Sequence, residues 1–479
     1  MKICSLYGVG YYYIPGTDTC IKIGGYVRLE AYHNAAGGLY SEGTPQGAFT
    51  RHTSDFAMQA RFRMSADFRT QTEYGTLRSY FAFGLNFLNS VGGAYETTGP
   101  GNSVAMERAF IQFAGFTLGR SDTFFAFYNG AAYGLVPFGF DGSSGPSGLN
   151  VAAYTWQFGN GLSATFSVED AIAHSAGVIE LNTNGLMGGG TVGGGNLFLP
   201  NGGGDQAGAK MPDLVANLRV DQAWGSAQIM GALHQVGARY NTTLPADATC
   251  AGGGGNTNLC GYPDDKWGWA VGAGMTLKMP WDPKDTLSGQ IAFAEGASKY
   301  VAFTYNNRSL HRDDGVSIGA FNDAVFASGN AATAGVGNSL ELTKTWGGTL
   351  AFEHYWTPSL RTSWVAGYLE VEYSDNAKQL LVNRGAGACA GNGITLANNA
   401  QCSNPDWSMW RLASRTMWNP VQNLDVGVEV AYTNVNTAFG GTAVLNPNQG
   451  GSGLSGGTYN IDDNSYWTAT FRVQRNFWP

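Results

Sequence analysis

Apolar and polar residues alternate strictly along most of the chain, and this period of two predicts β-strands. From Asp55 to Arg69, seven apolar residues beginning with Phe56 and ending with Phe68 share one face, and polar or small residues fill the other. The segments 267–279, 424–432 and 467–474 repeat the pattern. Because successive side chains of a strand point to opposite faces, each segment has one apolar and one polar face.

Sixteen segments show this alternation, and we find no convincing amphipathic helix of three turns between them. They begin near residue 21 and continue to the C-terminal end of the chain. They comprise residues 21–33, 54–69, 74–88, 103–114, 116–121, 150–159, 162–171, 212–224, 226–240, 266–279, 286–300, 343–356, 361–374, 406–418, 424–437 and 464–478.

The connections between these segments are alternately short and long. The short ones, such as 159–161, 281–285 and 419–423, contain the Gly, Pro, Asn and Asp residues that favour tight turns. Short turns at one end, long loops at the other and an even strand number are typical of outer-membrane barrels. The sequence therefore predicts an all-β fold, a 16-stranded antiparallel transmembrane β-barrel with long extracellular loops. The long connections are rich in Gly, Asn and Ala and include residues 34–53, 121–149, 172–211, 241–265, 301–342, 375–405 and 438–463.

A soluble β-sandwich would also alternate, but three features favour the membrane barrel. The apolar faces carry no charge, as expected where an Arg or Lys facing lipid costs about 2–4 kcal/mol. Lysine is sparse, and charged strand residues are mostly Arg beside small residues and Tyr, which suits a wet lumen. With the apolar faces outward, no large core is expected. Aromatic residues gather at strand ends, where a membrane-interface belt is expected, at Trp356, Trp407, Trp418, Trp467, Phe477 and Trp478.

The composition narrows the class of protein further. Charged residues make up 13% of the chain, about half the ~25% of an ordinary soluble domain, and 70 of 479 residues are Gly. With 13% aromatic residues the chain is not disordered, and it holds no apolar run of 18 residues that would form a membrane-spanning helix. The net charge of −8 gives no electrostatic support for a nucleic-acid partner.

Six cysteines form three couples that are close in sequence, Cys4 with Cys20, Cys250 with Cys260 and Cys389 with Cys402. Six cysteines allow fifteen connectivities, and loop-closure entropy favours the local ones. Free thiols or a metal site are the alternatives, but no Cys-x-x-Cys occurs and the histidines are scattered. We therefore expect three local disulfides and an oxidising compartment.

The sequence holds no recognisable catalytic or cofactor-binding arrangement. The dipeptide Gly-Lys of a phosphate-binding loop and the HExxH zinc motif are absent, and the serine cluster at 142–146 does not fit GxSxG. We therefore expect no enzyme activity, no catalytic residue, no cofactor and no metal.

Basic residues gather on the polar faces of the first four strands. Adjacent strands are about 4.8 Å apart, so these residues form an arc roughly 15 Å wide. One interpretation is local pairing inside the lumen, for example of Arg28 with Glu30. The other is that the arc forms one wall of a pore constriction, which acidic residues of a loop face. The basic residues proposed for this wall are Lys22, Arg28, Arg61, Arg63, Arg78 and Arg108.

The loop 121–149 is the candidate for the opposite side of the constriction. Its stretches 124–128 and 136–140 are too aromatic for a loop that extends into solvent, so we expect it to pack inside the barrel. The loop carries Asp122 and Asp141, and we expect these carboxylates to face Arg61 and Arg63.

The N-terminal sequence CSLYG…YYIPGTDTCIKIGGYVR, residues 4–28, closely resembles that of the alphaproteobacterial general porins of rhizobial and brucella type. The motifs ERAFI at 107–111 and TLGR at 117–120, and the last strand ending FRVQRNFWP, fit the same family. The resemblance implies a sixteen-stranded barrel, usually a homotrimer, whose third long loop folds inward. It also implies passive diffusion of ions and small hydrophilic solutes across the outer membrane. The chain departs from many such barrels in ending on Pro479 rather than on an aromatic residue.

These observations lead us to expect a general diffusion porin of the bacterial outer membrane. Residues 1–20 would form a periplasmic segment closed by a disulfide, and residues 21–479 the barrel, after removal of a signal peptide. Outer-membrane lipid and lipopolysaccharide would surround it. The alternatives are a channel specific for sugars or anions, or a structural or adhesive barrel. Trimer contacts are expected on outer faces near the first five strands and the last, which include Phe81, Phe83, Ile111 and Phe113; the alternative is that these residues simply face lipid.

Overall fold

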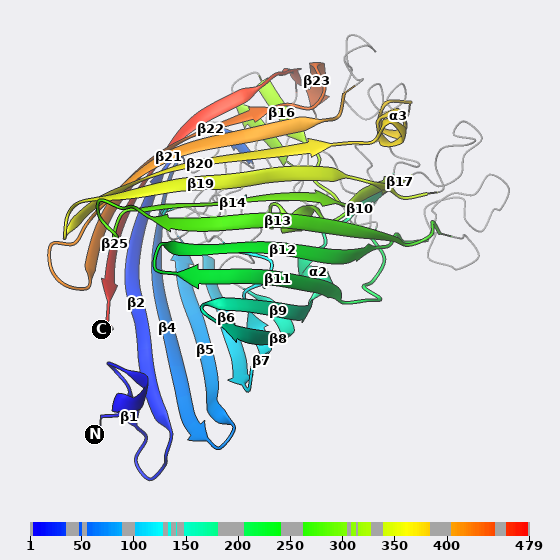
Figure 1. Ribbon diagram of the computed structural model, residues 1–479. Coiled ribbons are helices and arrows are strands. Elements are labelled where there is room, and N and C mark those ends of the chain that lie inside the picture. Colours follow the sequence, from blue (N-terminus) through cyan, green and yellow to red (C-terminus); the bar gives the residue numbers. More distant parts are fainter. Residues whose placement is uncertain are drawn as a thin grey trace.

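The computed structural model describes residues 3–34, 47–49, 55–88, 101–127, 133–135, 140, 148–180, 206–240, 262–303, 308–312, 315–326, 339–383, 404–445 and 457–477. Within this part of the chain, sixteen antiparallel strands form a closed barrel, as predicted (Figure 1). The last strand, β25, closes the barrel by pairing with the first, β2, so that no edge is left open.

Each barrel strand coincides with one of the sixteen predicted segments. Neighbours in sequence pair as hairpins around the whole barrel. The strands are β2 Cys20–His33, β4 Phe56–Thr72, β5 Gly75–Leu88, β6 Gly101–Phe113, β7 Phe116–Ser121, β8 Leu149–Gly159, β9 Leu162–Glu169, β11 Asp213–Gln222, β12 Gly225–Val236, β13 Lys266–Lys278, β14 Thr286–Glu295, β19 Lys344–Thr357, β20 Leu360–Glu372, β21 Trp407–Trp418, β22 Leu424–Asn436 and β25 Asn464–Asn476.

Tight turns connect the strands at one end of the barrel, and both chain termini lie at that end (Figure 1). Between β8 and β9 the chain reverses through Asn160 and Gly161, which both have positive φ angles of 50° and 73°. A Cβ on Gly161 would lie only 1.9 Å from the Asp221 carbonyl oxygen, so the turn requires glycine there. In outer-membrane barrels the short-turn end faces the periplasm.

The outward faces of the strands are apolar, as the alternation predicts. Large apolar side chains such as Ile229 and Leu350 are more than half exposed on this surface. Of the tryptophans expected in the interface belt, Trp356, Trp418 and Trp467 are exposed. The expectation was wrong for Trp407, which is buried and donates a hydrogen bond from its indole to the Ala320 carbonyl. Trp478 lies outside the described residues.

The connections at the other end contain secondary structure of their own. Strands from three different connections form one five-stranded sheet, and strands from two form a three-stranded sheet. The first sheet contains β3 Gly47–Phe49, β15 Arg308–Arg312, β16 Gly315–Gly319, β23 Gly441–Leu445 and β24 Gly457–Ile461, and the second contains β10 Val178–Glu180, β17 Ala324–Phe326 and β18 Glu341–Leu342. The short helices are α2 Ala171–His174, η6 Ser298–Tyr300 and α3 Asp375–Asn383. No helix in the described ranges is long and apolar enough to span a membrane.

A sizeable apolar core lies between these connections and the strands, contrary to the expectation that the barrel has none. Phe321, Tyr300 and Phe125 have no exposed surface and belong to one cluster with inward residues such as Leu369 and Met409. The expectation was wrong because the inward faces of β20 and β21 also carry apolar residues, in addition to their apolar outward faces. Inward apolar residues here pack against loops rather than facing water.

The N-terminal segment holds the disulfide Cys4–Cys20, as predicted. Its short strand β1, Tyr12–Tyr13, pairs with the beginning of β2, and η1 covers Ser5–Tyr7. Cys250, Cys260, Cys389 and Cys402 lie outside the described residues, so their pairing stays a prediction.

Candidate functional site

Arginines stand directly opposite one another on neighbouring strands of the lumen wall. Arg28 of β2 pairs in register with Arg61 of β4, and Arg69 of β4 pairs with Arg78 of β5. Like charges in directly opposite positions destabilise a sheet. Each pair is therefore held together by carboxylates that lie between or beside its members.

Glu107 of β6 neutralises part of the wall by binding two arginines of β4 at once. Its Oε2 accepts a hydrogen bond of 2.5 Å from Arg63 Nε, and its Oε1 accepts one from Arg61 Nη2. Gly84 of β5 makes room for the group, because a Cβ there would lie 3.0 Å from Glu107 Oε1 and 3.1 Å from Arg61 Nη2. The carboxylate is almost fully buried.

A β-bulge in β6 explains how Glu107 reaches this position. Ala82 of β5 pairs with Arg108, whereas the next residue, Phe83, pairs with Met106. Glu107 is the extra residue, so two consecutive side chains, Glu107 and Arg108, lie on the lumen side. Bulges commonly redirect a side chain in this way next to functional sites.

A second carboxylate, Glu30 of β2, links the first and last strands of the barrel, β2 and β25. It forms ion pairs with Arg28, at 3.1 Å from Arg28 Nε, and with Arg472 of β25, whose Nε donates a hydrogen bond of 2.6 Å. The Tyr32 hydroxyl donates to Glu30 Oε2 at 2.9 Å. Local pairing of Arg28 with Glu30, one of the two interpretations from the sequence, is therefore present.

A third carboxylate, Asp67 of β4, binds both members of the other arginine pair. Asp67 Oδ2 accepts hydrogen bonds of 3.0 Å from Arg69 Nη2 and 2.9 Å from Arg78 Nη2. Arg78 also donates to Gln112 Oε1 at 2.8 Å, and its guanidinium lies 5.3 Å from the Phe110 ring. This cluster lies nearer the short turns than the Glu107 group.

The two acids expected to face Arg61 and Arg63 have different outcomes. Asp122, where the loop begins after β7, forms an ion pair with Arg108 on the same wall. It lies beside the arc, and the carboxylate that contacts Arg61 and Arg63 is Glu107. Asp141 lies outside the described residues. An acidic cluster opposite the arc thus stays a prediction.

The described parts of the third long loop, which spans residues 121–149, lie inside the barrel, as expected. The Asn217 side chain of β11 donates to the Phe124 carbonyl at 2.7 Å, and the Phe127 N–H donates to Gln290 Oε1 of β14 at 2.7 Å. Farther along, the Leu135 N–H donates to Glu429 Oε2 of β22 at 2.5 Å. The described parts of the loop therefore contact the lumen face of one strand after another across the barrel.

Glycines in β13 form the seat of this loop. A Cβ on Gly274 would lie 2.5–2.7 Å from three atoms of Phe127, and one on Gly272 would lie 3.3 Å from the Phe125 ring. In the same loop, the Tyr133 hydroxyl forms a hydrogen bond of 2.8 Å with Ser288 Oγ of β14. The aromatic side chains thus fill space that the missing side chains of β13 leave open.

The charged wall as a whole carries more positive than negative charge. Of the side chains named for it, eight are cationic and four are carboxylates. Three residues of the site, Glu107, Asp67 and Arg472, were not expected there from the sequence. Asp67 and Arg472 fall on polar strand faces and could have been found from the alternation, but the bulge at Glu107 leaves no signal in it. The cations are Lys22, Arg28, Arg61, Arg63, Arg69, Arg78, Arg108 and Arg472, and the acids are Glu30, Asp67, Glu107 and Asp122.

The sequence of this chain is similar to those of known proteins. The chain matches the Porin subfamily over residues 1–468. It is 28% identical over 288 residues to the porin Omp2b of Brucella suis, which spans 57% of this chain and 71% of that protein. It is 27% identical over 321 residues to Omp2b of Brucella neotomae, covering 66% and 76% of the two chains.

The fold is also found among solved structures. The outer membrane channel DcaP of Acinetobacter baumannii superposes with a TM-score of 0.56 over 97% of this chain and 99% of its own, at 14% identity. The family and fold are those of a channel rather than an enzyme. The chain belongs to the Porin subfamily and is a general diffusion porin of the bacterial outer membrane, which it crosses with its strands.

Proposed function

We propose that ions and small hydrophilic solutes pass between the charged wall and the inward third loop. Arg61, Arg63, Arg108, Glu107 and Asp122 form the polar side of this passage. The observation that carries the proposal is the Glu107 group, a cluster of ionised side chains held on the lumen face at the level of the loop. Charged groups that line a narrow pore orient water and dipolar solutes and hinder bulky apolar ones.

The local charge, rather than the net charge of the chain, sets ion preference in this proposal. The wall has an excess of cationic side chains although the whole chain has a net charge of −8. The Debye length is about 8–10 Å at physiological salt. An ion in the passage lies within this distance of the wall, whereas most charged side chains on the outside of the protein are farther away. We therefore expect a channel that favours small anions over cations.

Conductance in planar lipid bilayers tests the proposal. The purified protein should give ohmic channels that open in three equal steps per insertion, and a salt gradient should give a zero-current potential of the sign for anion preference. A protein that inserts as intact oligomers without conductance would overturn the proposal and favour a structural barrel.

We further propose a homotrimer that is surrounded by outer-membrane lipid and lipopolysaccharide. On the outer wall, Phe62 packs against Phe83 at 6.4 Å and against Phe477 at 6.1 Å, and Phe81 packs against Phe83 at 6.5 Å between ring centroids. This patch of rings, together with Ile111 and Phe113, supports subunit contact. Within a membrane, apolar surfaces associate through close van der Waals packing. Native mass spectrometry of wild type and Phe83→Glu should show trimers and monomers, respectively.

A substrate-specific channel is the second candidate, and one observation favours it. Tyr80 and Phe110 stack at 5.2 Å in the lumen, with the Arg78 guanidinium 5.2 Å and 5.3 Å from their rings. Aromatic and cationic groups together can hold a planar anionic solute. Block of the single-channel current by millimolar aromatic carboxylates, without block by sugars, would support this alternative.

A further inference from the structure

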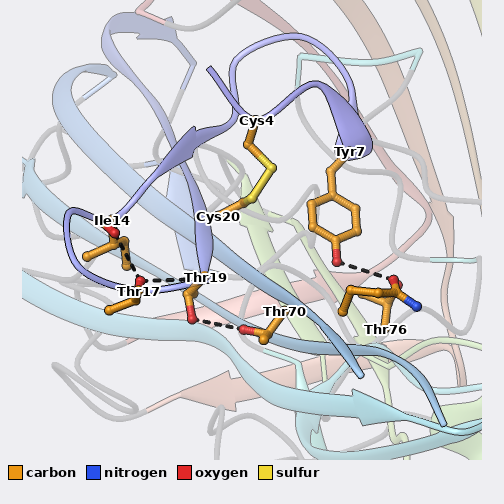
Figure 2. The surroundings of a disulfide bond; sticks show 9 residues. Cys4, Tyr7, Ile14, Thr17, Thr19, Cys20, Thr70 and Thr76 are labelled. Carbon is orange, nitrogen blue, oxygen red and sulfur yellow. Dashed lines mark hydrogen bonds between the residues drawn. A yellow bond between two sulfur atoms is a disulfide. The ribbon is translucent and has the colours of Figure 1, made fainter. Parts of the chain in front are cut away.

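The N-terminal segment extends the barrel wall at its short-turn end. Strand β25 stops at Asn476, opposite Tyr26, and β1 then pairs with the part of β2 that β25 leaves free, at Ile21 and Cys20. The disulfide Cys4–Cys20 ties the segment back to β2 (Figure 2). The segment is therefore fixed to the wall at two points.

From these points the segment folds over lumen-facing side chains of β2 and β4. The Arg69 guanidinium lies 5.0 Å from the Tyr11 ring and 5.7 Å from the Tyr7 ring. The Lys22 ammonium lies 5.7 Å from the Tyr11 ring and donates a hydrogen bond to the Val9 carbonyl at 3.4 Å. Two cations at the short-turn end of the wall, Lys22 and Arg69, thus contact this segment.

Two further hydrogen bonds fix the segment against β4. The Thr19 and Thr70 hydroxyls lie 2.9 Å apart (Figure 2). The Tyr7 hydroxyl donates to Gln71 Oε1 at 3.5 Å. Burial and a hydrogen bond to Asp67 raise the pKa of Tyr11 to about 12. Its hydroxyl therefore stays neutral and adds no negative charge at physiological pH.

The cluster carries a local excess of positive charge at one mouth of the pore. It contains Lys22, Arg69 and Arg78 against the single carboxylate of Asp67. Arg69 and Arg78 keep 28% and 26% of their side-chain surface exposed, so their field reaches the lumen. Arg69 lies six positions after Arg63 in β4, which is about 20 Å along the strand. The cluster is thus separate from the Glu107 group.

We infer that the N-terminal segment and the cluster of Lys22, Asp67, Arg69 and Arg78 form a second ion filter, at the short-turn mouth, that favours small anions. The inference rests on the proposed channel function. The Tyr7 and Tyr11 rings hold Arg69 over the lumen, Asp67 holds Arg78 beside it, and the disulfide keeps the segment that carries the two rings in place. Because the filter lies at one end, its effect depends on the salt concentration on that side, which screens exposed charges.

Reversal potentials in opposite salt gradients, with potassium chloride as the probe, test the inference. In the wild-type channel, high salt on the short-turn side should lower the anion preference more than the same salt on the loop side. Arg69→Gln with Arg78→Gln should remove this difference and lower the chloride-to-potassium permeability ratio about twofold or more. Lys284→Gln is the matched control, because Lys284 is exposed in the turn before β14 at the same end and outside the cluster.

Release of the segment gives a second measurement. Cys4→Ser with Cys20→Ser, or reduction of assembled wild-type channels by an impermeant phosphine added to the short-turn side, should reduce the difference between the two gradients and raise the conductance. An unchanged difference in the arginine variant, or an equal effect of Lys284→Gln, would overturn the filter. Wild-type protein that does not conduct would overturn the channel function itself, and the two failures are therefore distinct.

Discussion

Glu107 accepts a hydrogen bond of 2.5 Å from Arg63 Nε, so a carboxylate of β6 neutralises part of the basic wall two strands away, on β4. The bulge that places Glu107 on the lumen side keeps Arg108 on that side as well, where it forms an ion pair with Asp122 at the start of the third loop. Wall and loop are therefore joined through two consecutive residues. Changes in this group should alter ion preference with little effect on the barrel itself.

Glu107→Gln should increase anion preference. The change removes one negative charge from between Arg61 and Arg63. Coulomb's law in water gives about 0.5 kcal/mol for an ion ~8 Å from a unit charge, hence a permeability ratio changed about two- to fivefold. The reversal potential in a potassium chloride gradient measures it. Asp55→Asn, which alters an exposed carboxylate just before β4, is the control, and an equal shift in both variants would contradict the prediction.

Arg61→Gln combined with Arg63→Gln should shift the reversal potential in the opposite direction, toward cations. The double change leaves Glu107 as an uncompensated carboxylate in the passage. The expected shift is larger than that of Glu107→Gln, because two charges are removed instead of one. If the reversal potential is unchanged while the channel conducts normally, these arginines do not line the passage.

Gly274→Val should displace the third loop from its seat. The new side chain would occupy the space of the Phe127 ring, and overpacking of this kind costs about 1–3 kcal/mol. We expect altered single-channel conductance and faster proteolysis within the loop. Gly231→Ala on β12 is the control, since its Cβ would meet only the Ala270 carbonyl at an ordinary 3.7 Å. A Gly274→Val channel with wild-type conductance would show that this contact does not position the loop.

Asp285→Asn should destabilise the protein at neutral pH and have less effect in acid. Burial opposes ionisation of Asp285, yet hydrogen bonds from the Tyr355 N–H, His354 and Trp281 outweigh it and hold the pKa of this carboxyl below its usual range. A lowered folded-state pKa stabilises the fold above the unfolded-state pKa of about 3.9, and this stabilisation is lost as the pH falls through the folded-state value.

Urea unfolding at pH 7 and at pH 3 measures this effect. Loss of the buried, hydrogen-bonded carboxylate should cost about 1–3 kcal/mol at pH 7. The difference between wild type and variant should shrink at pH 3. Asp282→Asn, in the same turn, serves as the comparison because the Asp282 carboxylate is partly exposed and accepts its hydrogen bond from the Lys284 N–H of the turn itself. Equal differences at the two pH values would contradict the assignment.

The strands could be predicted because lipid outside and water inside impose alternation on every residue. Phe56–Thr72 follows from this contrast alone. The inward aromatic loop was equally evident, since its phenylalanines need an apolar environment. Where loops enter the lumen the contrast disappears, and Trp407 was therefore assigned to the wrong face.

The charged site could be predicted only in part. The arginines lie on the expected polar face, but their partners depend on register and on one extra residue in β6. Alternation says which face a side chain occupies and nothing about which residue of the next strand lies opposite. The contact of Glu107 with two arginines could therefore not be predicted from the sequence.

The seat that Gly272 and Gly274 form for the third loop has a consequence for exchange of parts between porins. The shape of the loop is specified partly by absent side chains on a strand more than a hundred residues away. If this loop were transplanted alone into a barrel with larger residues at these positions, its phenylalanine rings would clash with the strand. If a loop with smaller side chains replaced it here, a void would remain over Gly272 and Gly274. Loop and strand must be inherited, or engineered, as one unit.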